Sequence, residues 1–418
     1  MGSESTAPSG TRAAVPEVAH VGGPMIDEKL CRFYSPDWMA RLLVESLPID
    51  IPANVVDLGS GPGSLARAAA SQWPTSSFVT VDIDPAQRLD LKGTCASPIR
   101  HQHVCADVAS AELIESTLLR RNSFDLAISN PPYAVLDCAA EVDGMWHRAG
   151  LNSETPAWRE FPLDTLFLLQ ALALLRDSGT AGFIVPDSMI SGRPHEKFRK
   201  SLLDNHNVFR VIQLPRRAFM GTDAQAFILI LSKGRSSDII RLNRVDANGS
   251  TSEDIHILSH AGAKRLDFDF HRSATRPNDR ISLRQLGVEI TRGRASSVEV
   301  AQSTGKIFHT SDFPATTGGQ VSLSMRTEVR ERSKPVEAFP GDILVARVDR
   351  KLEDKIAVVA EGRSEISDCV LRLRCPPEFR ARVLSGLASD HGREQLKALS
   401  RGTGARHIAA AELLNLVV

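Results

Sequence analysis

The chain has 418 residues, which is enough for two or three domains and a large buried core. Hydrophobic residues make up 42% of it and charged residues 24%, the proportions of an ordinary globular protein rather than a disordered or fibrous one. The formal net charge of +0 rules out a globally basic or acidic binding protein, although a neutral total can still contain a basic face.

Several kinds of site and cellular location are disfavoured because the sequence lacks the patterns typical of them. The six cysteines are scattered and form no CxxC pair, so neither a metal site nor a disulfide framework is expected, and a reducing compartment fits. No apolar run reaches the roughly 18 residues of a membrane span. Residues 1–26 lack an apolar signal core and are rich in Ser, Pro, Gly and Ala, so we expect a disordered tail and a cytoplasmic protein.

The first predicted element is a helix that begins at Ser35-Pro36. Ser35 is a favourable N-cap, and proline is favourable as the first helical residue. Apolar residues at positions 39, 42, 43 and 44 then form one stripe that faces a core. The loop before this helix is expected to lie beside whatever the next motif binds.

A nucleotide-binding unit follows the helix. Residues 54–58 predict a buried strand, residues 59–63 a glycine-rich turn, and residues 64–70 a helix of good helix formers. Strand, Gly-x-Gly-x-Gly and helix in this order form the first unit of an α/β nucleotide-binding fold. The glycines allow the backbone to approach a ligand closely.

Polar side chains end four successive predicted strands. Asp57, Asp82, Asp107 and Asn130 occupy these strand ends, and Asp82 lies 19 residues after Gly63, near the spacing at which an acid binds ribose hydroxyls. Packing does not require polar residues there. A doubly wound sheet lines its ligand cleft in this way, so the sequence predicts an α/β fold with a cleft at the carboxyl ends of its strands.

The most informative stretch is Asn130-Pro131-Pro132-Tyr133, which follows the apolar run 124–128. The two prolines cannot donate backbone hydrogen bonds, so they end the strand and stiffen the turn. An amide and an aromatic ring are thereby held at the strand end. This pair suits a planar hydrogen-bonding group such as a nucleobase or an amide.

The complete set of motifs resembles the S-adenosylmethionine-dependent N6-adenine DNA methyltransferases of the gamma group, which occur in restriction–modification systems. The motifs that carry the resemblance are Tyr34-Ser35-Pro36, residues 57–63, Asp82-Ile83-Asp84-Pro85, Asp107 and Asn130-Pro131-Pro132-Tyr133. The resemblance spans roughly residues 27–235. It implies a Rossmann-like class I methyltransferase fold with a mostly parallel seven-stranded sheet, and we expect this catalytic domain over residues 27–275.

The resemblance also implies roles for individual residues. S-adenosyl-L-methionine would be bound by Tyr34, Ser35, Pro36, Asp57, Gly59, Gly61, Gly63, Asp82, Ile83 and Asp107. The Asn130 oxygen and the Pro131 carbonyl would accept the amine hydrogens of a flipped-out adenine, and Tyr133 would stack on the base, with Pro132 in the same catalytic loop. Further along, the basic segment 191–200 would lie over the cleft, with His195 and Phe198 as candidates for a second stacking ring.

The rest of the catalytic domain is predicted from apolar patterns. Residues 161–175 predict a buried helix, residues 177–180 the turn that caps it, and residues 181–186 a buried strand. Residues 208–214 and 226–231 predict two further strands. The polar stretch 234–280, with one short strand at 239–242, is interpreted as domain edge and linker.

The C-terminal part, residues 276–418, is expected to be a smaller α+β domain that recognises a DNA target. Strands are predicted in 341–348, 356–359 and 369–374, and the last alternates apolar and basic residues, which predicts a cationic face. Two segments resemble one target-recognition domain of type I specificity subunits. They are the strand Gly-Asp-Ile-Leu-Val-Ala-Arg and the segment Gly-Thr-Gly-Ala-Arg-His-Ile near the C-terminus. Arginine reads guanine edges and grips phosphates. The candidates for DNA contact are Arg347, Arg350, Lys351, Arg401 and Arg406.

The sequence therefore indicates a site-specific adenine-N6 methyltransferase that acts on double-stranded DNA and protects it in a restriction–modification system. A separate cognate restriction endonuclease would be its partner, and the chain would act as a monomer or homodimer. Two alternatives stay open. The same loop also occurs in enzymes that methylate RNA or a protein glutamine, and a non-catalytic DNA specificity protein could retain the cofactor fold.

Overall fold

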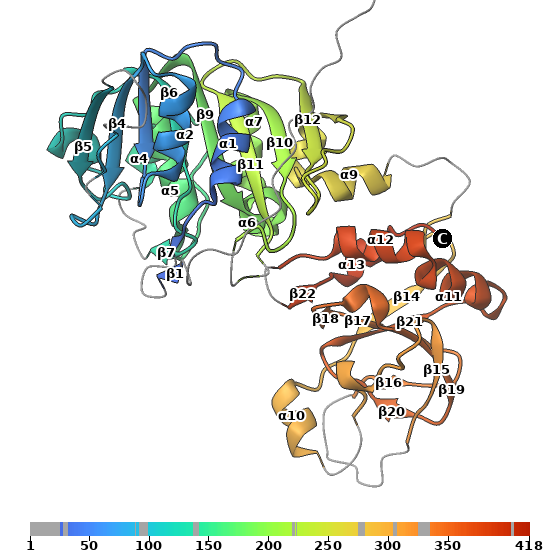
Figure 1. The fold of residues 1–418 in the computed structure, drawn as a ribbon. Coiled ribbons are helices and arrows are strands. Elements are labelled where there is room, and N and C mark those ends of the chain that lie inside the picture. Colours follow the sequence, from blue (N-terminus) through green and yellow to red (C-terminus); the bar gives the residue numbers. More distant parts are fainter. Residues whose placement is uncertain are drawn as a thin grey trace, which may run out of the picture.

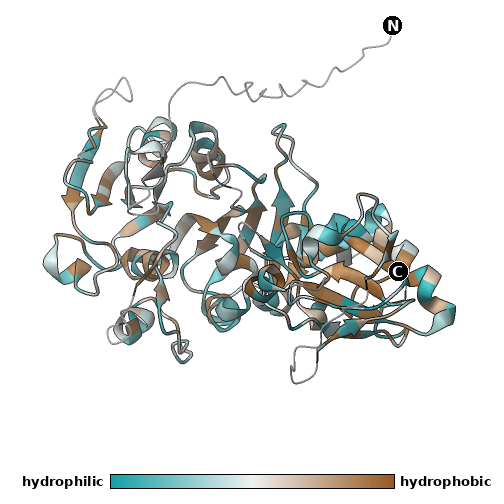
Figure 2. Ribbon diagram, turned by 90° about the horizontal axis from the view of Figure 1, so that it is seen from below, coloured by the Kyte–Doolittle hydropathy of each residue, from teal (hydrophilic) through white to brown (hydrophobic). Residues whose placement is uncertain are grey.

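The computed structural model describes residues 26–27, 32–87, 89–91, 99–136, 142–219, 222, 224–274, 281–303, 307–324, 335–402 and 405–418. These residues form two units, each with its own hydrophobic core (Figure 1). The tail expected over residues 1–26 lies, apart from Ile26, outside the described residues. In Figure 2 the strands of both units are mostly apolar, while hydrophilic residues lie toward the outside.

The N-terminal unit is built on a nine-stranded sheet in the order β13-β12-β10-β11-β9-β6-β3-β4-β5. The strands are β3 (Asn54–Leu58), β4 (Ser77–Asp82), β5 (Arg100–Cys105), β6 (Phe124–Ser129), β9 (Leu175–Pro186), β10 (Asn207–Gln213), β11 (Ala226–Ser232), β12 (Ile239–Arg244) and β13 (Ile255–Leu258). The strands β3, β4, β5, β6 and β9 run parallel to one another, whereas β11 is antiparallel to its neighbours. The carboxyl ends of the parallel strands therefore meet at one edge.

Helices cover both faces of this sheet. The helices α1 (Asp37–Glu45) and α2 (Ser64–Gln72) pack into the core on one face. The core on the other face includes α4 (Val142–Arg148), α5 (Leu163–Leu174) and α7 (Glu196–Asn205). Shorter elements are β1 (Ile26–Asp27), β2 (Arg32–Phe33), α3 (Leu113–Ser116), β7 (Val135–Leu136), β8 (Phe161–Pro162), α6 (Asp187–Ser191), η1 (Arg193–His195), α8 (Ser259–Lys264) and α9 (Phe268–Ala274).

Residues 234–280, interpreted as domain edge and linker, extend the sheet from the expected seven strands to nine, and the short strand predicted at 239–242 is β12. β12 pairs in parallel with β10, and β13 pairs antiparallel with β12. Ile240 and Leu242 of β12 are fully buried, and α8 and α9 pack beside them. The interpretation as a linker was wrong because the apolar residues alternate with Arg and Asn, so their burial depends on packing against distant elements.

Two helix boundaries also differ from the prediction. Ser35 does not cap α1, because its hydroxyl accepts a hydrogen bond from Asn130, and the N-cap is Pro36, whose carbonyl accepts from the Met39 and Ala40 amides. Residues 177–180 do not cap α5. β9 begins at Leu175, directly after the helix, and includes these residues.

The C-terminal unit contains a five-stranded sheet in the order β14-β21-β17-β19-β15. These strands are β14 (Glu289–Arg292), β15 (Gly319–Ser322), β17 (Ile343–Ala346), β19 (Ile356–Glu361) and β21 (Val370–Arg374). The helices are α10 (Ser297–Gln302), α11 (Arg380–Ala388), α12 (Asp390–Leu399) and α13 (Ala410–Leu413), and small elements are β16 (Glu337–Ala338), β18 (Val348–Asp349), β20 (Ser364–Glu365), β22 (Arg406–His407), η2 (Thr310–Asp312), η3 (Leu352–Asp354) and η4 (Pro377–Phe379).

A buried arginine connects the two units. Arg265 forms a two-pronged ion pair with Asp267, with Nε–Oδ1 and Nη2–Oδ2 distances of 2.7 and 2.8 Å. The same guanidinium donates to the main-chain carbonyls of Ala398 and Leu399 at the end of α12. Across the same junction, the Gly402 amide donates to the Asp187 carboxylate. These contacts fix α9 of the first unit against α12 of the second (Figure 1).

Candidate active site

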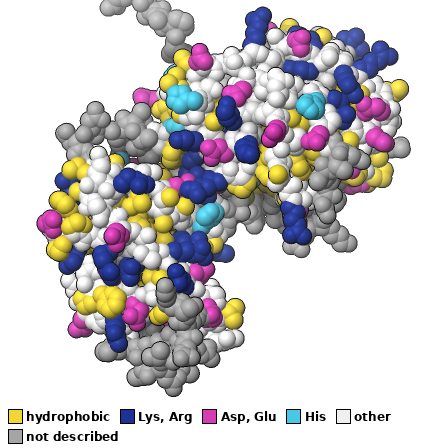
Figure 3. Space-filling model, turned by 180° about the vertical axis from the view of Figure 1, so that it is seen from behind, with side chains coloured by type: hydrophobic (Ala, Val, Ile, Leu, Met, Phe, Trp, Pro, Cys, Tyr) yellow, Lys and Arg dark blue, Asp and Glu magenta, His cyan; other side chains and the backbone are white. Residues whose placement is uncertain are grey.

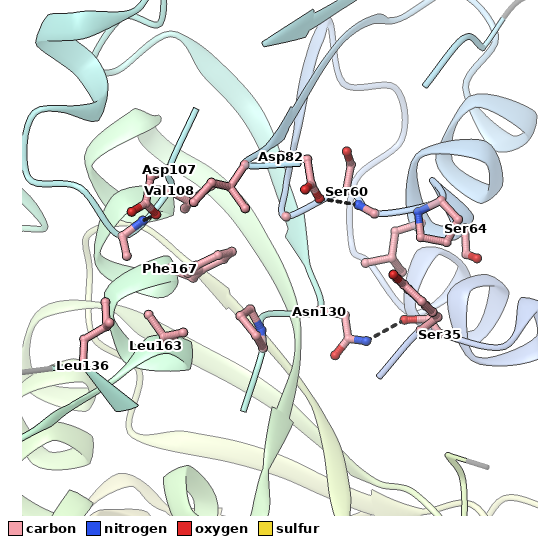
Figure 4. A pocket seen from close by; sticks show the side chains of 18 residues that line it. Ser35, Ser60, Ser64, Asp82, Asp107, Val108, Asn130, Leu136, Leu163 and Phe167 are labelled. Atoms are coloured by element: carbon pink, nitrogen blue, oxygen red, sulfur yellow. Dashed lines mark hydrogen bonds between the residues drawn. The ribbon is translucent and has the colours of Figure 1, made fainter. Parts of the chain in front are cut away.

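A cavity of about 240 Å³ opens at the carboxyl edge of the large sheet. Loops that follow β3, β4, β5 and β6 contribute to its walls, together with the loop before α1 and the first turns of α5 (Figure 4). The lining residues are Tyr34, Ser35, Gly59, Ser60, Gly61, Pro62, Ser64, Leu65, Asp82, Ile83, Asp107, Val108, Ala109, Asn130, Pro132, Leu136, Leu163 and Phe167. Strand ends that are far apart in the sequence are therefore brought to one site.

The glycine-rich loop follows β3 in a conformation that only glycine adopts without strain. Gly63 has a φ of +86°, and a Cβ there would lie 2.5 Å from the Leu89 side chain. Gly61 has a φ of +48°, and its amide donates to the Asp82 carboxylate at 2.7 Å. The Asp82 side chain thus holds the loop in place, while the loop backbone lines the cavity.

The acidic residues predicted to bind the cofactor line the cavity at two strand ends. Asp82 also accepts from the Asp84 amide, and Asp107 accepts from the Ala109 amide, both at 2.9 Å. Ile83 is 53% exposed at the rim. Backbone donors orient both carboxylates, and apolar side chains such as Phe167 stand opposite them across the cavity (Figure 4).

Asp57 lies beneath the glycine-rich loop rather than in the cavity wall. It is 1% exposed, its Oδ2 accepts from the Ala66 amide at 3.1 Å, and its Oδ1 has no hydrogen-bond partner among the described residues. Burial raises the pKa of this carboxyl from 3.8 to about 8. A buried carboxyl with an unsatisfied oxygen next to a glycine cradle fits a ligand that brings positive charge, such as the ammonium group of S-adenosylmethionine, since that charge would favour the ionised carboxylate that burial otherwise disfavours.

The raised pKa of Asp57 makes the stability of the protein depend on pH. Between about pH 4 and pH 8 the folded state holds a proton that the unfolded state has released, so the free energy of unfolding should fall as pH rises through this window. Asp57→Asn should remove this part of the slope and weaken binding of S-adenosylmethionine. Denaturant unfolding and calorimetry at about pH 5 and about pH 8 measure both effects. An unchanged pH slope in the variant would contradict the prediction.

The side chain of Asn130 is oriented by the loop before α1. Its Nδ2 donates to the Ser35 hydroxyl at 3.0 Å, so its oxygen is directed away from Ser35 (Figure 4). The preceding residue, Ser129, donates to the Leu58 carbonyl at 2.6 Å and ties the end of β6 to β3. Pro132 lines the cavity, and Pro131 is buried behind it. Ser35 and Asn130, which are 95 residues apart, therefore form one polar unit.

Tyr133 contacts an aromatic residue that the sequence interpretation did not single out. Its ring lies 6.2 Å from the ring of Phe219, edge to face, with an interplanar angle of 82°. Burial and the nearby Asp164 carboxyl raise the pKa of Tyr133, so its phenol is neutral. The pKa of Asp164 is itself raised by burial to about 7. Phe219 could have been identified as a candidate from the sequence, because it is a lone aromatic residue in the polar loop between two apolar strands.

The prediction that His195 or Phe198 presents a ring to the substrate is at odds with the structure. His195 is 5% exposed and Phe198 is fully buried. The ring of Trp158 lies 4.8 Å from that of His195, between centroids. Burial lowers the pKa of His195 to about 4, so it is neutral. No local pattern indicates that Trp158, 37 residues earlier, packs against this segment.

Three of the five arginines and lysines predicted to contact DNA make contacts within the C-terminal unit. Arg406 is 4% exposed, pairs with Glu353 and donates to the Arg350 carbonyl. Arg401 pairs with Glu412 at 2.6 Å, and Arg347 donates to the Asp368 carbonyl. By contrast, the side chains of Arg350 and Lys351 are exposed. Arg406 therefore supports the turn that carries these two cations.

The expected cationic face of β21 is also largely neutralised. Arg374 forms a two-pronged ion pair with Asp342, with both distances 2.9 Å. Arg372 donates to the Glu337 carbonyl and to the Thr291 hydroxyl. The alternation of apolar and basic residues was correct for the strand, but the acidic partner comes from the turn before β17. None of the helices that the structure describes could cross a membrane.

The parallel strand order, the glycine-rich loop after β3 and the cavity at the carboxyl edge define a class I S-adenosylmethionine-dependent methyltransferase fold. Residues 34–144 match the family model described as Methyltransferase small domain, and residues 98–271 match the one described as N-6 DNA Methylase. The sequence of residues 98–271 is thus similar to that of the N-6 DNA methylases, and curated relatives of the chain come from restriction–modification systems.

Individual relatives agree with this assignment. The chain is 30% identical over 115 residues to the MpnII type I restriction enzyme methylase subunit of Mycoplasma pneumoniae. This match covers 27% of this chain and 21% of the relative. It is 26% identical over 219 residues to type II methyltransferase M.XamI of Xanthomonas campestris pv. amaranthicola, a match that covers 51% of this chain and 41% of that relative. The chain thus spans less than half the length of the first curated relatives that it matches.

Among solved structures, the type IIG restriction endonuclease BpuSI resembles the chain with a TM-score of 0.49 at 13% identity. The match covers 91% of this chain and 57% of that one.

Proposed function

We propose that this protein transfers a methyl group from S-adenosylmethionine to the N6 amine of adenine in double-stranded DNA. The observation that carries the proposal is the Asn130 amide, whose nitrogen is engaged by Ser35 at the wall of the cavity. An amide held in this orientation presents its oxygen as a fixed acceptor. A fixed acceptor is what an amine needs in order to be aligned for methyl transfer.

The chemistry follows from the poor nucleophilicity of the adenine amine, whose lone pair is delocalised into the ring. The Asn130 oxygen and the Pro131 carbonyl would accept its two hydrogens and localise the lone pair on nitrogen. Because both acceptors lie on a loop stiffened by two prolines, little reorganisation is needed when the base arrives. Burial around this loop also strengthens each hydrogen bond.

The proposed cofactor supplies a methyl group on a positively charged sulfur. Residues that line the cavity would hold it directly, namely Tyr34, Ser35, Gly59, Gly61, Asp82, Ile83 and Asp107, with Phe167, Val108 and Leu163 as apolar wall. Pro36, Gly63 and Asp57 would support this set from outside the cavity wall. In this arrangement the carboxylates of Asp82 and Asp107 face polar groups of the cofactor, and the backbone of the glycine loop approaches its aminoacyl end.

Adenine lies inside the duplex, so the proposal requires the base to be flipped out at a cost of a few kcal/mol. Tyr133 would then stack on the base face, a contact of about 1–3 kcal/mol. Phe219 stands edge-on to Tyr133 and would keep its ring in place. We therefore assign Phe219 a role in supporting Tyr133, whereas the second stacking ring expected from His195 or Phe198 does not face the substrate.

The C-terminal unit would bind the DNA around the target base. Arg350 and Lys351 are its exposed candidates, and on the catalytic side Arg216 is exposed in the loop after β10. Figure 3 shows Lys and Arg side chains gathered along the hollow where the two units meet. Cations on both sides of a hollow suit a polyanionic duplex.

The similarity to restriction–modification methylases supports a biological role in protecting DNA from a cognate restriction endonuclease. The nuclease would be a separate partner, and the methyltransferase a cytoplasmic monomer or homodimer. This role requires methylation at a defined sequence, which the C-terminal unit would select.

The test is transfer of labelled methyl from S-adenosylmethionine to unmethylated bacterial genomic DNA, followed by nucleoside analysis and mapping of the methylated sites. We expect 6-methyladenine at one defined sequence. Parallel reactions with bulk RNA and with a release-factor protein cover the alternatives. Transfer to either of these, with none to DNA, would overturn the proposed substrate while leaving the cofactor assignment intact.

A further inference from the structure

Two successive exposed apolar residues stand at the mouth of the cavity. Val135 and Leu136 form β7, two residues after Tyr133, and are 53% and 38% exposed. Leu136 also lines the cavity. Successive side chains of a strand point to opposite faces, so one of the two would normally be buried. Among the residues that the structure describes, neither of the two side chains is buried, so core packing there does not explain the apolar pair.

A rigid support holds this pair in place. β7 pairs antiparallel with β8, with Leu136 opposite Phe161 and Val135 opposite Pro162, and the Leu163 amide donates to the Ala134 carbonyl at 2.9 Å. The half-buried ring of Trp158 packs 5.1 Å from Phe161. We refer to Val135, Leu136 and Trp158 together as the apolar lip.

The interior behind the apolar lip is aromatic. Trp158 donates from Nε1 to the Pro194 carbonyl at 3.1 Å, and its ring rests on those of His195 and Phe198. The burial of His195 and Phe198, which excluded them as substrate contacts, thus gives the lip a firm backing. Because its packing is rigid, the apolar lip would keep its position when DNA bases press against it.

The surroundings of the apolar lip favour a polyanion as its partner. Arg159 is exposed directly after Trp158 and is followed by the exposed Glu160, and Arg193 is 57% exposed next to Pro194. Arg193 also reaches the C-terminal unit, where it pairs with Glu412 at 3.4 Å. The lip therefore lies between the cavity and the junction of the two units, flanked by cations. Apolar side chains among cations match a base stack between two phosphate backbones.

We propose that the apolar lip is a wedge that enters the base stack of duplex DNA beside the target adenine and holds the duplex open while the base occupies the cavity. The inference rests on the proposed DNA adenine methylation and adds the element that separates the bases. Apolar wedges that unstack a base step are a general means of deforming DNA. The wedge offsets part of the cost of removing the base from the stack.

The test uses Val135→Thr, which keeps the size and branching of an exposed side chain but makes it polar. Single-turnover methylation is measured on a duplex with the mapped target adenine paired to thymine, and on one with an abasic site opposite that adenine. We expect Val135→Thr to be about tenfold slower on the paired duplex and within about twofold of the unmodified protein on the abasic one. Rescue by a target that is already unpaired is something a purely structural defect does not show.

Two further variants sharpen the result. Ile239→Thr changes another β-branched residue that is also 53% exposed, but on β12, and should leave both rates unchanged. Trp158→Ala removes the lip residue that packs on Phe161, His195 and Phe198, and it should show the same rescue pattern as Val135→Thr, with unchanged affinity for S-adenosylmethionine. If Trp158→Ala does not fold, the exposed Val135 still provides the test.

The outcomes separate this inference from the proposed function. Absence of DNA methylation by the unmodified protein would overturn the proposed function itself. If the unmodified protein methylates DNA, then a Val135→Thr rate equal to its own on the paired duplex, or equally reduced on both duplexes, overturns the wedge. Fluorescence of 2-aminopurine at the target position gives a second readout, and we expect a smaller rise with Val135→Thr than with the unmodified protein.

Discussion

Asn130→Ala is expected to reduce methyl transfer by about a thousandfold while leaving affinity for S-adenosylmethionine within a few-fold of the original. The change removes the fixed acceptor for the adenine amine but leaves the glycine loop, Asp82 and Asp107 in place. Only the contribution to aligning and activating the amine is lost. Single-turnover methylation with saturating DNA and cofactor, together with calorimetric titration of the cofactor, measures the two quantities separately.

Two companion variants test whether Asn130→Ala loses activity because the hydrogen-bond acceptor is gone. Asn130→Asp keeps an oxygen acceptor and can accept a hydrogen bond from the Ser35 hydroxyl, so it should retain more activity than Asn130→Ala. Ser35→Ala leaves the acceptor but removes the group that orients it, and we expect an intermediate loss. Activity of Asn130→Ala comparable with that of the unmodified protein would refute the role of this residue.

Arg265→Ala is expected to lower the free energy of unfolding by about 3–5 kcal/mol, because it leaves the Asp267 carboxylate buried without its partner. It also removes the donors to the Ala398 and Leu399 carbonyls, so the junction of the two units should loosen. Denaturant unfolding gives the stability, and DNA binding at fixed salt gives the functional effect, which we expect to be a clear loss of affinity.

The matched control is Arg241→Ala. Arg241 pairs with Asp254 at 3.4 Å with both side chains substantially exposed, and such pairs contribute about 0–1 kcal/mol. The double variant Arg265→Met with Asp267→Leu removes both buried charges and should recover much of the stability. It should not recover DNA affinity if the contacts to α12 orient the C-terminal unit. A loss below about 1 kcal/mol for Arg265→Ala would contradict this account.

The parts of the fold that were predicted from the sequence are those set by local patterns. The run before Asn130 and the strand before Gly59 are apolar, short and ended by residues that cannot continue a strand, so their type and end were evident. The placement of Asp82, Asp107 and Asn130 in one cavity follows from parallel strands having their carboxyl ends at one edge. In a parallel sheet, residues that are found at strand ends from local patterns alone can therefore be assigned to one common site.

The parts that were missed depend on contacts between residues far apart in the sequence. Trp158 and His195 meet only in the folded chain, and so do Tyr133 and Phe219. An arginine near the C-terminus reads as a surface cation, because nothing nearby shows that Glu353 lies within reach of Arg406. The strand at 239–242 was predicted, but its place in the sheet and the whole of β13 were missed, because their apolar residues are few and they become part of the sheet only through pairing of β12 with β10 and of β13 with β12.

The way in which Arg265 holds α12 has a consequence for how such proteins diversify. Its guanidinium contacts only main-chain carbonyls of the second unit, and Asp187 likewise receives a main-chain amide. At positions 398, 399 and 402 the junction therefore depends on the shape of the main chain rather than on side-chain identity, whereas Glu412 contributes a side chain that pairs with Arg193. Under the proposed function, residues of the second unit away from these positions and from Glu412 can change while the junction persists, so the chain can acquire a new DNA target without losing the position of that unit on the first.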